Sequence, residues 1–402
     1  MAYTVNSGNV DTADPTANTD IRSVAKAMSY LDQDNTQFTT MLQRMPSEQI
    51  AHWKHEWPED QLLPQHTSLA ASITSGATVI TVTTDEGVIA RAGDVALCTI
   101  TGERMLITNQ YASAWSVVRG FGGTAGTSSV SAGAKMVIVG NTNEQNAAAP
   151  TAIITARTIN YNYSGIFRDV LDFAGTTEVL QYYGEEGGLF SSEKRKKLIE
   201  HKWRQERAAF WGARAYTTGS NGKPQTSTGG LFDFISTNRT NVSASLGTSE
   251  FQDILRVALQ YGNRARKVLF VAPLVAQVLS SFLSANWVRA TPQDTVWGVS
   301  VDYVVSGAFA GREIPVVVKT DWMRFGEVGG FDPGSCGFIV DMDNVARLPL
   351  VRNGVNRDTH FRDNIQNPDI DGHKAEYLTE VAYRFQVEQS HSLFYNVLVA
   401  AA

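Results

Sequence analysis

The sequence predicts an α+β fold that carries a small inserted all-β domain. Residues 67–140 contain short runs of β-forming residues, separated by turn signals, and show no helical periodicity. A long amphipathic helix is predicted over 191–214, and helices alternate with strands from residue 248 onward. The chain has 402 residues, of which 43% are hydrophobic and 18% charged, so it can bury a large core without disulfide bonds.

The composition excludes several classes of protein. Cys98 and Cys336 are the only cysteines, which rules out a disulfide scaffold and a zinc site with four thiolates. The formal net charge of −6 does not indicate a dedicated nucleic-acid or membrane binder. The first basic residue is Arg22, so the positive start of a secretory signal is missing. No apolar run reaches the roughly 20 residues that a membrane span needs. We therefore expect synthesis in the cytoplasm and no membrane partner.

The first 55 residues are predicted to form an arm and short helices. Residues 1–19 are small, polar and aperiodic, which favours an extended arm. Asp20 can cap a helix over 21–31, and a second short helix is expected around Phe38, ending before Pro46. Residues 52–66 contain two tryptophans and two prolines, and we expect them to be extended or looped.

The stretch 67–140 differs from the sequence around it. Only 8 of its 74 residues are charged, and their charges sum to zero. Its strand spacing is typical of a small sandwich or barrel that folds independently. The segments 56–66 and 141–190 on either side are expected to form an extended hairpin. Strands are predicted inside the stretch over residues 78–83, 95–100, 105–108, 115–119 and 136–139.

The strongest helix signal covers 191–214. Ser191 can cap this helix, and the loop 216–230 that follows is rich in Gly, Ser and Thr. The helix holds eight basic and three acidic residues, a net charge of +5. Such a run is either a solvated face or a contact with acidic protein surface or nucleic-acid phosphates. An apolar stripe is expected to hold the helix on its sheet, formed by Leu198, Ile199, Trp203, Ala209, Phe210 and Ala213.

From residue 248 the pattern is α/β. Ser249 and Gln252 match a capping box, and Gly262 can end the helix that they begin. A second helix is expected over 274–283. The tail, 376–399, reads mostly as strands. Strands are also predicted over residues 268–272, 301–305, 314–319 and 337–341.

Two glycine-containing motifs resemble nucleotide-binding loops only superficially. Gly120, Gly122 and Ala125 match a dinucleotide-binding pattern, but Gly, Ser and Thr follow them in place of a helix, which favours a turn. Residues 219–224 have the wrong spacing for a phosphate loop, and Pro224 stands where a hydroxyl is needed. We expect both segments to be loops.

One polar cluster has metal-ligand chemistry. Asp369, Asp371 and His373 offer oxygen and nitrogen ligands, and polar turn residues explain them equally well. A calcium loop beginning at Asn367 would need glutamate where the apolar Leu378 stands. No catalytic serine or zinc-hydrolase motif occurs. We therefore expect no enzyme, cofactor or assigned metal site, and a weak metal site in this cluster stays open.

The order of the elements and several local sequences resemble major capsid proteins of tailed bacteriophages with the Hong Kong ninety-seven fold. HKWRQERAAFWG, 201–212, looks like part of their spine helix, and TGGLFDFI, 228–235, like the segment leading into their axial domain. DIRSVAKAMSYLDQDNTQFTTMLQRMP, 20–46, is similar to their N-terminal helix and the loop after it. The returning strands of their peripheral domain resemble GFIVDMDNVARLPL, 337–350, and AEYLTEVAYRFQVEQSHSLFYNV, 375–397.

The resemblance implies a domain organisation. It places an N-terminal arm and helix over 1–55, an extended hairpin over 56–66 and 141–190, and the inserted domain over 67–140. The peripheral domain with the spine helix would cover 191–245 and 342–402, and the axial domain 246–341.

The resemblance also implies a function in the virion. Copies would form pentamers and hexamers that close into an icosahedral head around double-stranded DNA. The acidic N-terminal scaffolding region of many relatives is missing, which implies a separate scaffolding protein. The portal and an optional decoration protein would be further partners. Lys135 is the only lysine between Trp57 and Phe190, so we expect no covalent cross-linking of the hairpin.

Two sets of site residues follow. Aromatic residues of the hairpin are expected at intersubunit contacts, because aromatics dominate interface energetics; they are Trp53, Trp57, Tyr161, Tyr163 and Phe167. The spine helix of similar proteins lies towards the inner surface, so its basic face is expected to be free to face DNA, with Lys194, Lys196, Lys197, Arg204 and Arg207. The alternatives are an α/β enzyme built on residues 268–284, or a virion surface-binding protein that uses the β domain.

Overall fold

A computed structural model describes residues 36–398, except 46–47, 125, 127–128, 147, 151, 181–187, 282–287, 290–294, 297–298, 301, 307–311 and 327–329. Helices and strands are mixed along the chain, which confirms the predicted α+β class. The expected arm over 1–19 and the helix over 21–31 lie outside the described residues. The chain divides into two compact units, Trp57–Asn160 and the remainder.

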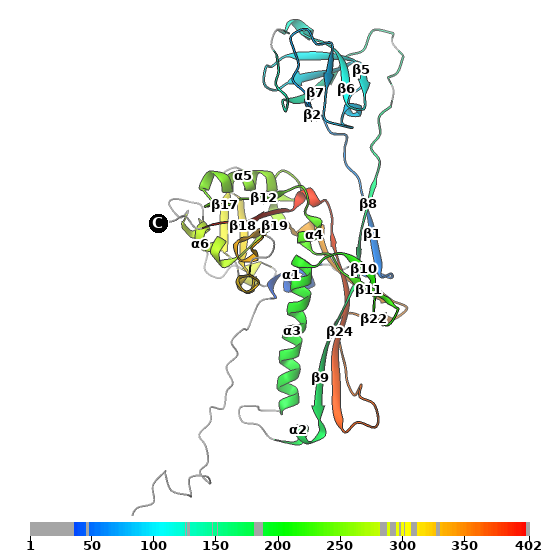
Figure 1. The fold of residues 1–402 in the computed structure, drawn as a ribbon, viewed down its shortest axis with the longest axis vertical. Helices are drawn as coiled ribbons and strands as arrows, with labels where there is room; N and C mark the ends of the chain where they lie inside the picture. The colour runs from blue at the N-terminus through cyan, green and yellow to red at the C-terminus, as the bar shows by residue number, and fades with distance from the viewer. Residues whose placement is uncertain are drawn as a thin grey trace, which may run out of the picture. The chain divides into compact units, whose positions relative to one another are not determined.

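The unit Trp57–Asn160 is built on one six-stranded sheet with the order β2-β7-β4-β5-β6-β3, in which neighbouring strands are antiparallel (Figure 1). Its core is separate from that of the rest of the chain and includes Trp115, Met105 and Met136. All five strands predicted here are present, with ends that differ by a few residues. The strands are β2 His66–Ser68, β3 Val79–Thr81, β4 Asp94–Cys98, β5 Arg104–Tyr111, β6 Ala114–Val118 and β7 Lys135–Asn141, with short 3₁₀ turns at Gly87–Ile89 and Phe121–Gly123.

Two paired strands join this unit to the rest of the chain. β1 Lys54–Glu59 leads into it and β8 Thr158–Tyr163 leads out, and the two form their own two-stranded sheet. The unit boundary falls within both strands. The chain therefore leaves the unit beside the place where it enters.

The second unit contains a seven-stranded mixed sheet with the order β12-β25-β19-β13-β18-β17-β14. β13 lies parallel to β18 and antiparallel to β19, and every residue of β13 is buried. Such a hydrophobic run is expected for a strand that is covered on both faces. The strands are β12 Arg239–Asn241, β13 Lys267–Val271, β14 Val288–Arg289, β17 Asp302–Ser306, β18 Arg312–Val318, β19 Gly337–Asp341 and β25 Ser392–Tyr395.

Helices pack with this sheet. α5 Thr248–Ala258 begins one residue before the predicted Ser249 cap, and the Glu250 carboxylate accepts from the Gly247 amide at 3.0 Å. The predicted capping box at Ser249 is therefore wrong. The expected helix over 274–283 is α6 Pro273–Ser281 within the described residues. The short helix around Phe38 is α1 Gln37–Arg44, and its Phe38, Met41 and Leu42 enter the same core.

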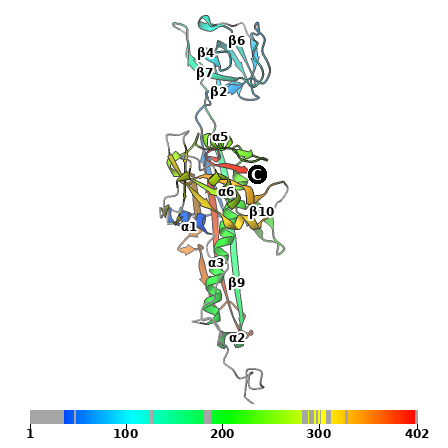
Figure 2. The ribbon, with the colours of Figure 1, turned by 90° about the vertical axis from the view of Figure 1, so that its left-hand side faces the viewer.

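The remainder of this unit is built mainly on a long strand ladder and a long helix (Figures 1 and 2). β24 Gly372–Phe385 pairs antiparallel with β9 Gly165–Ala174, and also with β20 Val345–Pro349 and β23 His360–Arg362. α3 Leu189–Trp211 runs alongside β9 and β24. The smaller elements are α2 Gly175–Val179, α4 Leu231–Phe234, β21 Val351–Arg352 and β22 Val355–Asn356, together with β15 Thr295–Val296 and β16 Val299–Ser300.

The two ends of α3 differ from those predicted from the sequence. The helix begins two residues before Ser191, after Gly188 with its φ of +90°, and it ends three residues earlier than expected. Gly212 caps its C-terminus, and the Gly230 amide donates to the Gly212 carbonyl at 2.7 Å. A Cβ on Gly212 would lie 2.4 Å from the Thr228 carbonyl, so only glycine permits this close approach.

The segment expected to be a loop over 216–230 also differs from the prediction. It holds an antiparallel hairpin of β10 Ala215–Thr218 and β11 Pro224–Ser227. Its turn is closed by the Gly219 amide, which donates to the Lys223 carbonyl at 2.8 Å. Gly, Ser, Thr and Asn resemble a loop in sequence, but the pairing of the two strands gives their backbone groups partners.

Candidate functional site

Aromatic side chains gather where β1 and β8 meet the β10–β11 hairpin. Trp53 stacks on Tyr163 at 5.3 Å and on Tyr216 at 5.5 Å between ring centroids. Tyr161 contacts Tyr163 edge to face at 5.5 Å. Trp53 is 39% exposed and Tyr216 is half-exposed, so the cluster presents stacked rings to its surroundings. We call Trp53, Tyr161, Tyr163 and Tyr216 the aromatic cluster.

Cations extend the aromatic cluster. The Lys54 ammonium and the Arg214 guanidinium each lie 4.4 Å from the Tyr161 ring centroid. Arg214 also donates to the Tyr161 carbonyl at 2.8 Å. Cation–π contacts of this kind hold amphipathic surfaces together and are common at interfaces.

Three of the five predicted contact residues belong to this cluster, and two do not. Trp57 is only 2% exposed, and its Nε1 donates to Glu59 Oε1 at 2.9 Å. Phe167 is partly buried and packs against the main core. Tyr216 was not predicted, because the sequence around it resembles a loop. No pattern in the sequence links it to Trp53, which lies more than 160 residues away.

The five basic residues predicted to be free on α3 are engaged within the chain. Lys196 pairs with Glu193, Lys197 with Glu200 at 2.7 Å, Arg204 with Asp169 at 2.7 Å and Arg207 with Asp321 at 3.7 Å. Lys194 lies 3.7 Å from the centroid of the Phe361 ring. The expectation that these side chains are left free is therefore wrong.

Two other cations of α3 carry the uncompensated charge. Arg195 is exposed and Lys202 is half-buried. Neither has an ion pair or hydrogen bond within the described part of the chain. They are seven residues apart, about two helical turns, and therefore point to the same side of the helix.

The buried stripe of α3 is polar at its centre, contrary to the apolar stripe expected. His201 contacts Asp169 Oδ2 and Thr379 Oγ1, each at 2.7 Å. Burial lowers the pKa of His201, although its contact with Asp169 opposes that effect. Gln205 Nε2 donates to the same Thr379 hydroxyl at 3.2 Å, while Ile199 of the expected stripe is exposed. Hydrogen bonds as well as hydrophobic contacts thus fix α3 on β9 and β24.

Glu206 links α3 to the first described helix. Its carboxylate accepts from the backbone amides of Phe38 at 2.9 Å and Thr39 at 2.5 Å, at the N-terminus of α1. Lys319, which follows β18, donates to the same carboxylate at 2.9 Å and to Gln37 at 2.8 Å. Glu206 and Lys319 are buried, as are Phe38 and Thr39 at the start of α1. The Glu206 carboxylate therefore lies at the N-terminal, positive end of that helix. We call Glu206, Lys319 and the N-terminus of α1 the Glu206 anchor.

The motifs considered for metals and cofactors do not converge in the structure. His373 lies between Glu178 at 3.0 Å and Asp363 at 2.6 Å, so both of its ring nitrogens are occupied. Within the described residues, no group of three His, Cys, Asp or Glu side chains is placed to hold a metal ion. Cys98 and Cys336 are both buried thiols. No helix of the described chain is long and apolar enough to cross a membrane.

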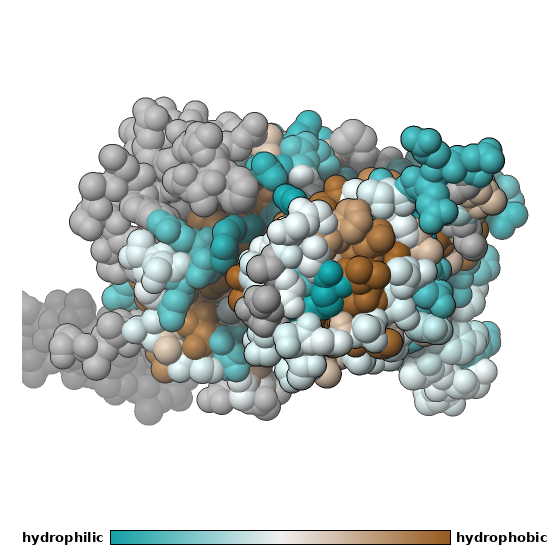
Figure 3. Space-filling model, turned by 90° about the horizontal axis from the view of Figure 1, so that it is seen from above, coloured by the Kyte–Doolittle hydropathy of each residue, from teal (hydrophilic) through white to brown (hydrophobic). Residues whose placement is uncertain are grey.

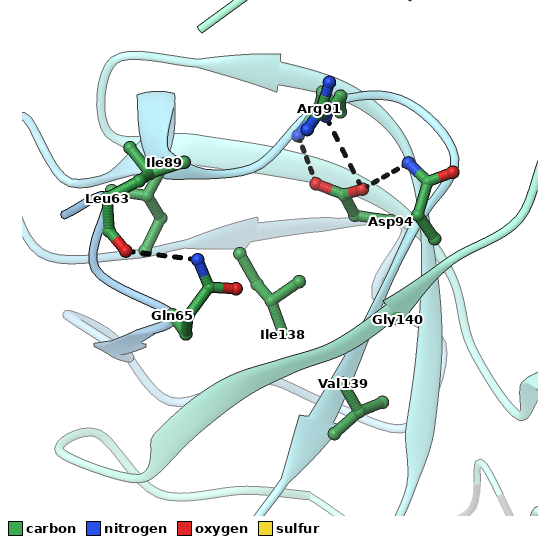
Figure 4. A pocket seen from close by; sticks show the side chains of 9 residues that line it. Leu63, Gln65, Ile89, Arg91, Asp94, Ile138, Val139 and Gly140 are labelled. Carbon is green, nitrogen blue, oxygen red and sulfur yellow. Dashed lines mark hydrogen bonds and ion pairs between the residues drawn. The ribbon is translucent and has the colours of Figure 1, made fainter. Parts of the chain in front are cut away.

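A pocket in the Trp57–Asn160 unit was not predicted (Figure 4). Leu63, Ile89 and Ile138 form its apolar side. On the polar side, Asp94 accepts from the Arg91 amide at 2.9 Å and from Asn141 Nδ2 at 2.7 Å. The Asp94 carboxylate thus already has partners within the chain, whereas Arg91 Nε, 3.9 Å from Asp94 Oδ1, is buried with no hydrogen-bond partner among the described residues.

The family model described as SU10 major capsid protein matches residues 5–397. No curated protein sequence matches the chain. Among solved structures, the capsid of a native GTA particle is 8% identical, with a TM-score of 0.48 over 97% of this chain and 99% of that one. The cyanophage A-1(L) capsid is 11% identical, with a TM-score of 0.47 over 93% and 97% of the two chains. The encapsulin SrpI of Synechococcus elongatus PCC 7942 is 9% identical, with a TM-score of 0.42 over 61% and 78%.

Proposed function

The chain belongs to the SU10 major capsid protein family, and from this premise we propose that its copies form pentamers and hexamers that close around double-stranded DNA. The match over residues 5–397 is the observation that carries the proposal. This match confirms the resemblance to major capsid proteins that the local sequences showed. The protein is a structural subunit of a virion capsid, and its family is not an enzyme family, so the alternative interpretation as an α/β enzyme is wrong.

The proposed partners follow from this role. Copies of the chain are the principal partner, with a separate scaffolding protein during assembly in the host cytoplasm. A portal would be a further partner, and a decoration protein is an optional one. Packaged DNA would contact the inner surface through phosphates alone, because DNA of any sequence must fit.

The aromatic cluster supports a role in contacts between subunits. Permanent interfaces commonly bury roughly 2,000 Å² or more in total, with aromatic and arginine anchors near their centre. Trp53, Tyr163 and Tyr216 are stacked and partly exposed, and Arg214 lies on the adjoining ring. We propose that these rings anchor a neighbouring copy, whereas Trp57 and Phe167 pack within their own chain.

The basic helix supports a role in DNA contact. α3 has a net positive charge, but four of its basic side chains form ion pairs with acidic residues of the same chain. Among the described residues, only part of the positive charge is therefore available to bind DNA. We therefore propose that Arg195 and Lys202 make the first phosphate contacts. Lys194, Lys196, Lys197, Arg204 and Arg207 contribute to the field around them. Such contacts are weak and sensitive to salt.

Assembly is tested by expressing the chain with its scaffolding protein. We expect shells in negative-stain images and megadalton species in mass photometry. A strictly monomeric population at every salt and protein concentration would contradict the proposal. Nuclease protection of DNA in filled heads tests whether the shell encloses DNA.

The DNA contact is tested with two double variants of α3. Arg195→Gln with Lys202→Gln should lower the slope of log affinity for DNA against log salt by about two, because each phosphate contact contributes about 0.9. Lys196→Gln with Lys197→Gln is the matched control, since both of those lysines are already paired. Equal slopes for the two variants would remove Arg195 and Lys202 from the DNA contact.

A further inference from the structure

The sheet of the Trp57–Asn160 unit has a second apolar face. The unit's core includes the side chains of one face, such as Ala96, Met105 and Met136. The residues that alternate with them point to the other face and do not belong to the core cluster. In the space-filling view from above, brown hydrophobic residues reach the surface among pale and teal ones (Figure 3). The residues of the second face, which we call the aliphatic face, are Val95, Leu97, Leu106, Val118 and Val137.

The strand register makes the aliphatic face continuous. Leu106 of β5 lies opposite Val95 on one side and Val118 on the other, so three aliphatic side chains cross three strands in one row. Leu97 lies opposite Val137 in the next row. Val118 is 51% exposed at one end of the first row, whereas Val95 at the other end is only 6% exposed. The other members of the face, Leu97, Leu106 and Val137, are half-buried. A partly exposed row of aliphatic side chains on a soluble protein is a candidate interaction site.

The charges on the aliphatic face have one sign. Arg104 lies opposite Leu97, and Lys135 precedes Val137 by two residues, so both cations share this face. Both are exposed, and neither has an ion pair in the part of the chain that the structure describes. Asp94 and Glu103 are each adjacent in sequence to a residue of this face and therefore point away from it, with their own partners. Two copies of this face would repel each other in a twofold contact.

The extended segments near the two ends of the unit's chain offer the complementary chemistry. Leu62 is 94% exposed and Ile154 is 90% exposed. The two segments contact each other near these residues, where Thr155 Oγ1 donates to Asp60 Oδ1 at 3.4 Å. Glu59, Asp60 and Arg157 lie in these segments, where Arg157 pairs with Asp60 at 3.4 Å, and Glu144 lies in the same connection, before residue 152. The segments thus combine exposed aliphatic side chains with a net negative charge.

We propose that the aliphatic face of one copy binds the extended segments 59–63 and 152–157 of the next copy. This inference rests on the proposed self-assembly and adds the two surfaces that meet. The surfaces are different, so the contact is head-to-tail and can continue around a closed ring. Aliphatic contacts supply the attraction, and the pairing of Arg104 and Lys135 with Glu59, Asp60 or Glu144 sets the register.

Zero-length cross-linking tests which surfaces meet. Shells co-assembled from ordinary and ¹⁵N-labelled copies are treated with a carbodiimide, which joins an amine directly to a carboxylate. We expect peptides that link Lys135 to Glu59, Asp60 or Glu144, with mixed isotope labels that prove the link is between copies. Links of Lys135 only within one copy, only to other carboxylates, or to none would overturn the inference.

A matched pair of variants tests the aliphatic face itself. Val118→Asp places a charge on the face, whereas Val88→Asp places the same charge on a side chain of equal exposure in the 3₁₀ turn Gly87–Ile89. We expect Val118→Asp to reduce the cross-link yield about tenfold, which corresponds to about 1.4 kcal/mol, and Val88→Asp to leave it unchanged. Equal yields in the two variants would overturn the inference. Shells that assemble without the Lys135 link would leave the capsid function intact while removing this contact.

Discussion

At the scale of single residues, Glu206 joins three parts of the chain through one carboxylate. The Glu206 anchor holds α1 to α3 and to the end of β18, far apart in sequence. The Glu206 side chain is buried, and Lys319 and the amides of α1 are its polar partners. Loss of the Glu206 charge leaves the Lys319 ammonium buried without its counterion.

Glu206→Gln is therefore expected to destabilise the subunit by about 3 kcal/mol, the range found when one partner of a buried pair is removed. Glu193→Gln is the matched control on the same helix, because its pair with Lys196 is partly exposed and such pairs contribute less than about 1 kcal/mol. Chemical unfolding followed by tryptophan fluorescence measures both. Similar losses in the two variants would contradict the role of the Glu206 anchor.

His391 is expected to make the protein less stable in acid. Burial lowers the pKa of His391 to about 3, and the Lys267 ammonium adds to the effect. Below the ordinary pKa of about 6.5 the unfolded chain takes up a proton that the folded chain refuses, so stability falls as pH drops from 6.5 towards 3. The buried His201, whose pKa is also lowered, acts in the same direction.

The measurement compares the free energy of unfolding at pH 6.5 and pH 5 in the parent protein and in His391→Gln. The parent should lose about 2 kcal/mol through this residue, at about 1.4 kcal/mol per pH unit, and the variant should lack that part of the dependence. Identical slopes would contradict the prediction. His373 acts oppositely at higher pH: partial burial lowers its pKa, but the contacts with Asp363 and Glu178 raise it overall. Its stabilisation is therefore present below about 6.5 and is lost as pH rises through the raised pKa.

At the scale of elements, the aromatic cluster depends on the β10–β11 hairpin. Tyr216→Ala and Trp53→Ala should each weaken assembly, because a stacked aromatic pair contributes about 0.5–1.5 kcal/mol beyond its buried area. Tyr261→Ala is the matched control, with a similarly exposed ring outside the cluster. The concentration needed for shell formation, read by light scattering, should rise for the first two variants alone. A rise in the control as large as theirs would contradict the role of the cluster.

Local patterns predicted many elements well, and contacts between distant segments set the rest. The strand Gly337–Asp341 has the predicted ends, because five consecutive buried residues leave little choice of structure. The pairs of Lys196 with Glu193 and Lys197 with Glu200 are spaced three residues apart and can be read from the helix itself. The Arg204–Asp169 and Arg207–Asp321 pairs and the place of Tyr216 join segments distant in sequence, so no local pattern predicts them.

At the scale of the whole molecule, the unit Trp57–Asn160 has its own core and its own sheet. Expressed alone, it should melt cooperatively, with an unfolding enthalpy of about 60–80 kcal/mol, as expected for a domain of about 100 residues. Differential scanning calorimetry gives the enthalpy, and far-ultraviolet circular dichroism shows whether strands are present. A random-coil spectrum would contradict its independence.

The pairing of β1 with β8 has a consequence for protein engineering. The chain leaves the larger unit on β1 and returns on its partner β8, so the two cut points at Glu59 and Thr158 lie side by side. Any foreign domain whose termini are adjacent can be grafted there without stretching the strands that carry it. The β1–β8 pair is thus a natural mounting point for a foreign domain.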